Sequence, residues 1–188
     1  SGKNPDKVNT GLFRNIPLLN NIPNIEKWKM GIGWLMTTRG IPMMYYGTEI
    51  LMTGYTDPDA KVRADYPGGW SSDAVNKFTK EGRTDQENEA YNYIKKLASF
   101  RKKSRAITAG KTMQFVPIDG VYVYFRYNDS ETVMVIMNSS DKEMALDMNR
   151  YAERTGSFSK GLNVVTDAEV ELESLKIGSK GLLILQLK

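Results

Sequence analysis

One short apolar run limits the folds open to the first half of this chain. Residues 41–46, Ile-Pro-Met-Met-Tyr-Tyr, are the one strand-like stretch before residue 106. Continuous apolarity over so few residues is typical of a parallel strand that is buried on both faces. A lone strand cannot pair its own backbone N–H and C=O groups, so it needs neighbours on both edges. Residues 1–105 supply no such neighbours, and we expect them to be part of an incomplete α/β arrangement.

A helix is predicted on each side of this run. Residues 25–36 carry apolar side chains at helical spacing, behind Asn24 as a candidate cap. Gly31 and Gly33 weaken that helix, and we expect them to allow close packing against a sheet. The second predicted helix covers residues 85–103.

A capping box opens the second helix. Thr84 and Glu87 have the spacing at which the two residues exchange hydrogen bonds with each other's backbone N–H groups. Before this box, residues 47–82 read as a loop rich in Gly, Asp, Tyr and Trp. Such a long connection argues for a function or for small internal elements.

After residue 106 the pattern changes to short strands separated by turns. Asp119-Gly120 is a typical hairpin dipeptide. About seven short strands at regular spacing predict an antiparallel β-sandwich, which we expect to fold alone. The chain therefore divides into residues 1–105 and residues 106–188. The predicted strands are residues 113–116, 121–127, 132–138, 143–147, 163–165, 170–175 and 181–187.

Composition excludes several chemistries. The 188 residues contain neither histidine nor cysteine, which rules out imidazole catalysis, thiolate nucleophiles and thiolate metal sites within them. The net charge of +4 is spread out, and its one dense basic cluster, residues 101–105, lies where cations favour a helix end. We therefore expect no nucleic-acid partner. No apolar run is long enough to cross a bilayer, so we expect no membrane partner either.

Candidate binding residues gather after the apolar run. Tyr46 and Glu49 would lie at the carboxyl end of the predicted strand, where α/β folds bind ligands, although local hydrogen bonding is the favoured interpretation for Glu49. The loop with Arg63, Asp65 and Trp70 suits sugar binding, because an indole stacks on a pyranose and charged groups bind its hydroxyls. A self-packed loop explains the same residues equally well.

Two further patterns are better explained by structure than by binding. Asp57-Pro58-Asp59 offers too few oxygen donors for calcium and reads as a turn, so we predict no metal site. The aromatic strand with Tyr122, Tyr124, Phe125 and Tyr127 is more typical of core and cross-strand packing than of a binding platform.

The residues also resemble a known family. Residues 39–49, R-G-I-P-M-M-Y-Y-G-T-E, resemble the eighth barrel strand of the α-amylase family of glycoside hydrolases. Residues 63–70, R-A-D-Y-P-G-G-W, look like the neopullulanase and cyclomaltodextrinase branch. Residues 50–54, 76–79, 81–84 and 119–124 agree with that branch.

The resemblance implies a partial (β/α)₈ barrel, consisting of the last helix, strand and helix, followed by an all-β antiparallel sandwich. Such enzymes cleave α-1,4 and α-1,6 glucosidic bonds with retention, using a carboxylate nucleophile and a carboxylic acid/base. In the family, the three catalytic carboxylates sit on barrel strands four, five and seven. The strand-seven signature is Asn-His-Asp, and this chain has no histidine.

We therefore expect a C-terminal fragment without catalytic residues, inactive alone, from an enzyme whose partner is an α-glucan or maltooligosaccharide. Tyr46, Arg63, Asp65 and Trp70 are the candidate substrate-binding residues. The resemblance implies no cofactor and leaves calcium open. It also leaves periplasmic, secreted and cytoplasmic locations open. Self-association of the incomplete barrel is expected, and a non-catalytic carbohydrate-binding module is the alternative function.

Overall fold

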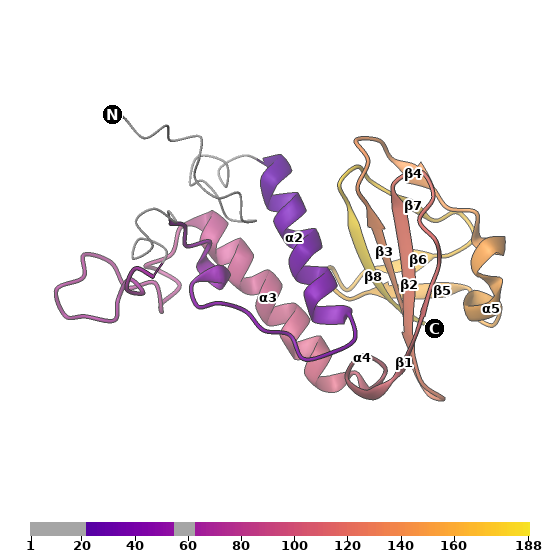
Figure 1. Cartoon of the computed structure of the whole chain (residues 1–188), viewed down its shortest axis with the longest axis horizontal. Coiled ribbons are helices and arrows are strands. Elements are labelled where there is room, and N and C mark those ends of the chain that lie inside the picture. Colours follow the sequence, from indigo (N-terminus) through magenta and orange to yellow (C-terminus); the bar gives the residue numbers. More distant parts are fainter. Residues whose placement is uncertain (1–21, 55–62) are drawn as a thin grey trace, which may run out of the picture. The chain divides into compact units, whose positions relative to one another are not determined.

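A computed structural model of the chain describes residues 22–54 and 63–188, which belong to two compact units (Figure 1). The loop unit comprises the described residues among 1–28 and Met43–Asn92. The sheet unit comprises Lys29–Pro42 and Tyr93–Lys188. The unit boundary passes through both long helices, so each helix contributes residues to both units. No helix among the described residues has the length and apolarity needed to span a membrane.

The sheet unit is built on antiparallel strands, as the sequence predicts. Its main sheet has six strands in the order β1-β2-β3-β8-β5-β6, and every neighbouring pair is antiparallel. A second sheet pairs β4 with β7. The strands are β1 (Lys111–Gln114), β2 (Val121–Tyr127), β3 (Thr132–Asn138), β4 (Met144–Ala145), β5 (Lys160–Asn163), β6 (Glu169–Glu171), β7 (Lys176–Ile177) and β8 (Leu182–Leu187).

The predicted hairpin is present between β1 and β2. Asp119 and Gly120 both have positive φ, 50° and 82°, the backbone that a two-residue turn of this kind needs. The residues on either side, Ile118 and Val121, exchange backbone hydrogen bonds of 3.0 and 2.8 Å. The turn thereby sets the register in which Phe125 pairs with Met113.

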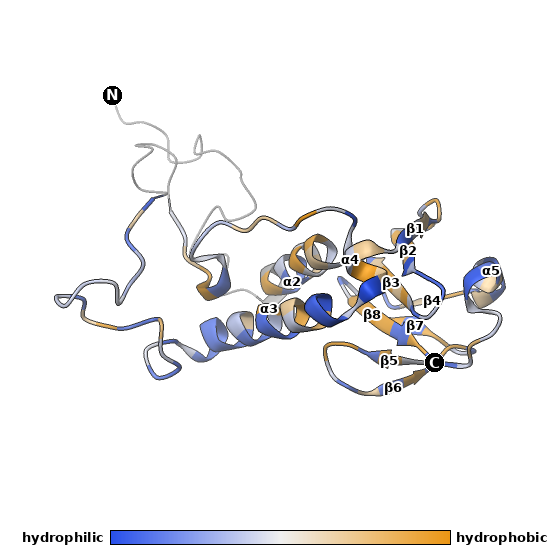
Figure 2. Cartoon of the chain, turned by 90° about the horizontal axis from the view of Figure 1, so that it is seen from below, coloured by the Kyte–Doolittle hydropathy of each residue, from blue (hydrophilic) through white to orange (hydrophobic). Residues whose placement is uncertain are grey.

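The central strands are buried on both faces of the main sheet. On one face, Phe125 of β2 joins a core that also includes residues of β3, β7 and β8. On the other face, the side chains of Tyr124, Val135 and Ile184 are also buried, and these residues pair across neighbouring strands. Hydrophobic residues accordingly run along β3 and β8 (Figure 2). The burial of Tyr124 and Phe125 confirms that this aromatic strand belongs to the core.

Helix α2 (Ile22–Thr37) covers part of the second face of the sheet. The Thr37 hydroxyl lies 2.5 Å from the Tyr124 hydroxyl and also donates a 2.6 Å hydrogen bond to the Gly33 carbonyl. Gly33 approaches β8 so closely that a Cβ atom there would lie 2.0 Å from Leu182 Cδ2. The close packing predicted for Gly33 is therefore confirmed, and the sheet it packs on is the antiparallel one.

The short helix α4 (Arg105–Ala109) links the helical part of the sheet unit to β1. Ser104 caps it through a hydrogen bond from the Ile107 N–H, 3.1 Å long. At the other end, the Arg126 guanidinium of β2 donates to the Ile107 carbonyl at 2.8 Å. Arg126 is buried and serves here as a fixed donor to a helix end.

Residues 41–46 do not form the predicted strand. In the described part of the chain, every strand lies at or after Lys111. Ile41 is 95% exposed and Met43 is 87% exposed, so the run is not buried. Among the described residues, no strand pairs with this run, so its backbone lacks the ladder that a strand requires.

Of the two predicted helices, the second has the predicted bounds and the first starts early. Helix α3 covers Asp85–Lys103. Helix α2 begins at Ile22, so Asn24 lies inside it, and the prediction that Asn24 caps the helix is wrong. Pro23 does not prevent this start, because a proline in the first helical turn removes an N–H that has no intrahelical partner there.

Candidate functional site

Residues 63–84 of the loop unit form two successive turn segments ahead of helix α3, which we call the double turn. The Asp73 carboxylate closes its first part by accepting hydrogen bonds from the Gly68 N–H at 2.7 Å and the Trp70 N–H at 3.0 Å. These backbone donors, Trp70 first, lower the pKa of Asp73. The ionised Asp73 therefore fixes the backbone that carries Trp70.

The second part of the double turn lies against the first. The Lys77 N–H donates a 2.9 Å hydrogen bond to the Pro67 carbonyl. Gly68 has a φ of +105°, and a Cβ atom there would lie 2.7 Å from the Asn76 Cα atom. Only glycine fits this backbone and this approach, so the P-G-G sequence of the loop has a structural reason.

Trp70 and Asp65, which belong to the loop for which sugar binding and self-packing were both predicted, lie together in the structure. The indole Nε1 of Trp70 donates a 3.1 Å hydrogen bond to Asp65 Oδ2. Trp70 is nevertheless 64% exposed. The hydrogen bond holds one edge of the indole and leaves most of the ring in solvent, the state in which an aromatic ring can stack on a flat apolar ligand face.

The other two predicted residues flank this pair. The Tyr46 hydroxyl donates a 2.9 Å hydrogen bond to the Ala64 carbonyl. Partial burial, the hydroxyl of Tyr45 and the charge of Asp65 raise the pKa of Tyr46, while the charge of Arg63 lowers it. Arg63 is exposed. The structure thus brings Asp65 and Trp70 into contact and sets Tyr46 and Arg63 within electrostatic range.

Glu49 acts locally, in line with the favoured interpretation. It follows Thr48 in the short 3-10 helix Thr48–Ile50 and forms a hydrogen bond with the Tyr66 side chain. Burial first, and then the charge and hydrogen bond of Glu49, raise the pKa of Tyr66 to about 12. The ring of Tyr66 also lies 4.4 Å from that of Phe78, centroid to centroid.

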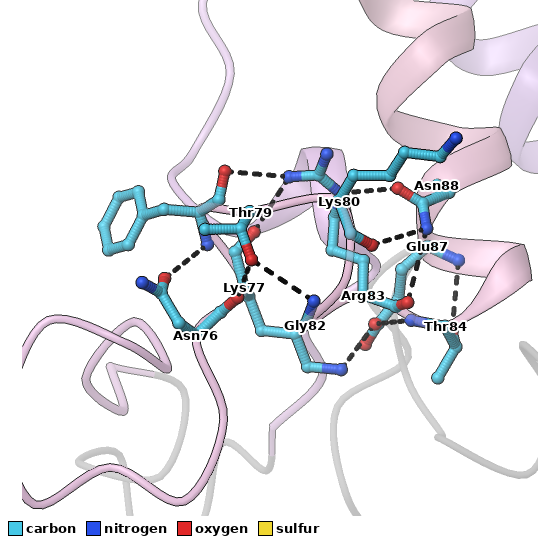
Figure 3. Close-up of polar contacts among 10 residues, drawn as sticks. Asn76, Lys77, Thr79, Lys80, Gly82, Arg83, Thr84, Glu87 and Asn88 are labelled. Atoms are coloured by element: carbon cyan, nitrogen blue, oxygen red, sulfur yellow. Dashed lines mark hydrogen bonds and ion pairs between the residues drawn. The ribbon is translucent and has the colours of Figure 1, made fainter.

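An arginine that the sequence analysis did not single out joins the double turn to α3 (Figure 3). Arg83 Nη1 donates to the carbonyls of Lys77 and Phe78 at 2.9 and 3.2 Å. Its Nε donates to Asn88 Oδ1 at 2.9 Å. Its Cζ lies 4.1 Å from the centre of the Tyr91 ring. Residues 81–84 contribute to the family resemblance, but no local pattern marks Arg83 for this role, because two of its three hydrogen-bond acceptors are backbone carbonyls.

The predicted capping box lies next to Arg83 and is confirmed. The Thr84 N–H donates to Glu87 Oε2 at 2.7 Å, and the Glu87 N–H donates to Thr84 Oγ1 at 3.2 Å. Glu87 also accepts a 2.5 Å bond from Lys77, and both of these side chains are largely buried. The ion pair thus joins the helix start to the double turn a second time.

No metal centre is visible in the described ranges, 22–54 and 63–188. They contain no group of three acidic, histidine or cysteine side chains that could hold an ion. Asp57 and Asp59, considered above for calcium, lie outside the described residues. Within the loop unit, Asp65 and Asp73 engage the loop itself and Glu87 the start of α3. The geometry suits binding of a neutral polar ligand with flat apolar faces.

Comparison with known proteins places these observations in a family context. Residues 112–186 match the family described as Cyclo-malto-dextrinase C-terminal domain. A cyclomaltodextrin glucanotransferase of Geobacillus stearothermophilus is 29% identical over 161 residues, covering 81% of this chain and 20% of that protein. An alpha-amylase of Niallia circulans is 32% identical over 117 residues, covering 62% of this chain and 19% of that protein.

Solved structures share the fold over most of the chain. The alpha-amylase of Geobacillus thermoleovorans, complexed with acarbose, aligns with a TM-score of 0.62 and 23% identity over 90% of this chain and 34% of its own. AmyP in complex with maltose aligns with a TM-score of 0.64 and 16% identity over 86% of this chain and 34% of its own. At these identities the likeness concerns the fold.

The chain spans about a fifth of the length of the curated relatives it matches. The family match at residues 112–186 coincides with the strands of the sheet unit from β1 to β8. The relatives extend the likeness to residues ahead of the sheet, since one of them covers 81% of the chain. The resemblance read from the sequence is thereby confirmed: the chain is similar to the C-terminal part of α-amylase-family glycoside hydrolases.

Proposed function

We propose that this chain is the C-terminal part of a retaining α-glucan hydrolase of the neopullulanase and cyclomaltodextrinase type. The match of residues 112–186 to the cyclo-malto-dextrinase C-terminal domain supports that branch. Relatives named as cyclomaltodextrin glucanotransferase and alpha-amylase support α-glucans as the substrate class of the complete enzyme.

The domain organisation follows from the same proposal. Residues 1–105 would belong to the last part of a (β/α)₈ barrel, and residues 106–188 to the C-terminal β-domain. The run at residues 41–46 supports this division, because over residues 41–45 the exposed Ile41, Met43 and Tyr45 alternate with less exposed residues. That alternation suits a strand whose partners come from elsewhere in the enzyme. In isolation, the same exposed run would promote self-association.

The role proposed for these 188 residues is substrate contact without bond cleavage. The observation that carries it is the exposed indole of Trp70, held by Asp65 at 3.1 Å on a turn that Asp73 fixes. An indole stacks on the apolar face of a glucose unit, and Asp65 and Arg63 would bind its hydroxyls. The nucleophile and the acid/base would come from other parts of the enzyme.

Two measurements on the 188-residue chain test this role. Incubation with maltoheptaose, pullulan and cyclodextrin should release no reducing ends above the buffer control, whereas the complete enzyme should release them readily. Hydrolysis by the chain at the rate of the complete enzyme would overturn the non-catalytic role. Calorimetric titration with maltoheptaose should show weak binding that Trp70→Ala abolishes, and no heat at millimolar sugar would rule out substrate contact through this loop.

A further inference from the structure

Arg83 is bonded both to helix α3 and to the loop ahead of it. The proposed substrate contact does not by itself explain this position. It lies between the double turn that carries Trp70 and the start of helix α3 (Figure 3). A side chain that is bonded to both a helix and a loop can restrict the motion of the loop. Whether it does so depends on how firmly each of its ends is held.

On the helix side, Arg83 is held by three contacts. Its Nε donates to Asn88 Oδ1 at 2.9 Å, and its guanidinium lies over the Tyr91 ring at 4.1 Å. The Asn88 amide returns a 3.3 Å hydrogen bond to the Arg83 carbonyl and a 3.0 Å bond to the Lys80 carbonyl. Asn88 and Tyr91 belong to α3, whose first turn is closed by the capping box. The guanidinium is therefore attached to a regular, capped helix.

On the loop side, Arg83 Nη1 holds the carbonyls of Lys77 and Phe78. Lys77 is in turn bonded to the part of the loop that carries Trp70, because its N–H donates a 2.9 Å hydrogen bond to the Pro67 carbonyl. Phe78 makes a second connection to that part of the loop, because its ring contacts the ring of Tyr66. Tyr66 and Pro67 belong to the turn between Asp65 and Trp70.

The chemistry of the contact requires arginine. A guanidinium presents several N–H donors in one rigid plane, so it can bind carbonyls with one edge, an amide with another and an aromatic ring with its face. A lysine ammonium on a flexible stem can hold fewer of these acceptors in fixed directions. Within residues 63–188, the side-chain N–H groups of Arg83 donate to uncharged acceptors, the Asn88 amide and the carbonyls of Lys77 and Phe78, so these bonds fix directions and neutralise no charge.

We infer that Arg83 is a positioning residue for glucan contact, holding the Asp65–Trp70 turn against helix α3 in the conformation that meets the sugar. This inference rests on the proposed function, since it concerns the same contact surface. It adds a residue that would touch no sugar itself. Its removal should weaken binding through the loss of order at Trp70, and the folded sheet unit should be preserved.

The test follows Trp70 directly in the 188-residue chain labelled with 5-fluorotryptophan. The variants are Arg83→Lys, Asn88→Ala and, as a matched control at an exposed arginine, Arg105→Lys. The ¹⁹F resonance of Trp70 is assigned by Trp70→Phe. Maltoheptaose titrations give the dissociation constant, and far-UV circular dichroism with thermal melting reports the folded state.

We expect Arg83→Lys to weaken maltoheptaose binding about tenfold and to shift or broaden the Trp70 resonance before sugar is added. Asn88→Ala should act in the same direction to a smaller extent, and Arg105→Lys should leave both readouts unchanged. If Arg83→Lys lowers the circular dichroism signal of the whole chain, Asn88→Ala carries the same test with the arginine in place.

The two proposals fail differently. Wild-type binding that both variants retain, with the Trp70 resonance unchanged, would overturn the role of Arg83 and leave the proposed function standing. Absence of maltoheptaose binding by the wild-type chain would overturn the contact surface itself, and with it this inference.

Discussion

The loop unit and the sheet unit are stabilised in different ways. In the loop unit, side chains such as Asp73 and Arg83 bind backbone groups close in sequence. In the sheet unit, strands far apart in sequence pair, as β3 and β8 do, and apolar side chains are buried on both faces. The first arrangement holds an exposed indole in a fixed local backbone, and the second forms a buried apolar core. Substitutions in the two units should therefore affect different properties.

The largest effect on stability should come from removing helix α2 from the sheet, as in a chain truncated to residues 106–188. The second face of the sheet, with Tyr124 and Val135, is buried in the presence of α2, which precedes every described strand and lies outside residues 106–188. Contrary to the expectation from the sequence, we predict that residues 106–188 alone do not unfold cooperatively. Thermal melting and dye binding to exposed apolar surface check this. A sharp melt equal to that of the whole chain would show that α2 is dispensable.

A cavity in the sheet core should have the next largest effect. Phe125 is fully buried against Phe115 and Tyr151, with ring centres 5.9 and 6.4 Å away. Phe125→Ala should lower the free energy of unfolding by about 3–5 kcal/mol. Urea titration followed by circular dichroism measures the loss. The ¹⁹F resonance of Trp70 should stay in place while the chain is folded, and its displacement would mean that the two units do not respond separately.

The buried hydroxyl of Tyr124 predicts a loss of stability at alkaline pH. Burial raises the pKa of Tyr124 above its usual value near 10. The folded chain therefore keeps this proton more tightly than the unfolded chain does. Stability from this group is complete below about pH 10 and falls as the pH rises beyond it. Tyr124→Phe should show a smaller decline between pH 9 and 11 in urea titrations, and equal slopes would contradict this assignment.

The smallest effect should come from the helix cap of the loop unit. Thr84→Ala removes the hydrogen bond that Thr84 accepts from Glu87 at the start of α3. The expected cost is about 1 kcal/mol, which makes the amides of the first turn exchange about fivefold faster with solvent. Hydrogen exchange of that segment measures it, with β2 as internal control. Equal acceleration in β2 would mean that the cap stabilises the whole chain.

The sequence predicts the parts of the fold that depend on local pattern. The bounds of α3, β2 and β3 follow from the capping box, the alternating aromatic residues and the Asp119-Gly120 turn. The two-residue strand β7 was missed, because only its pairing with β4 makes it a strand. Residues 41–46 were predicted to be a strand because their pattern is apolar, but a strand also needs a pairing partner, and no described strand pairs with this run.

The site shows the same division between local and non-local information. From the sequence, Asp65 and Trp70 were candidates either for sugar binding or for a self-packed loop, and the structure shows the two in contact. Arg83 could not be selected, because its acceptors are backbone carbonyls and a helix amide that only the folded turn brings together. For Glu49 the sequence favoured local hydrogen bonding, and in the structure Glu49 contributes to the raised pKa of Tyr66.

The most direct test of the account is hydrogen exchange of the 188-residue chain with and without maltoheptaose, read out by mass spectrometry. The account predicts that saturating sugar slows exchange in residues 63–84 of the loop unit and leaves the strands of the sheet unit unchanged. Protection confined to the strands, with residues 63–84 exchanging as before, would contradict it.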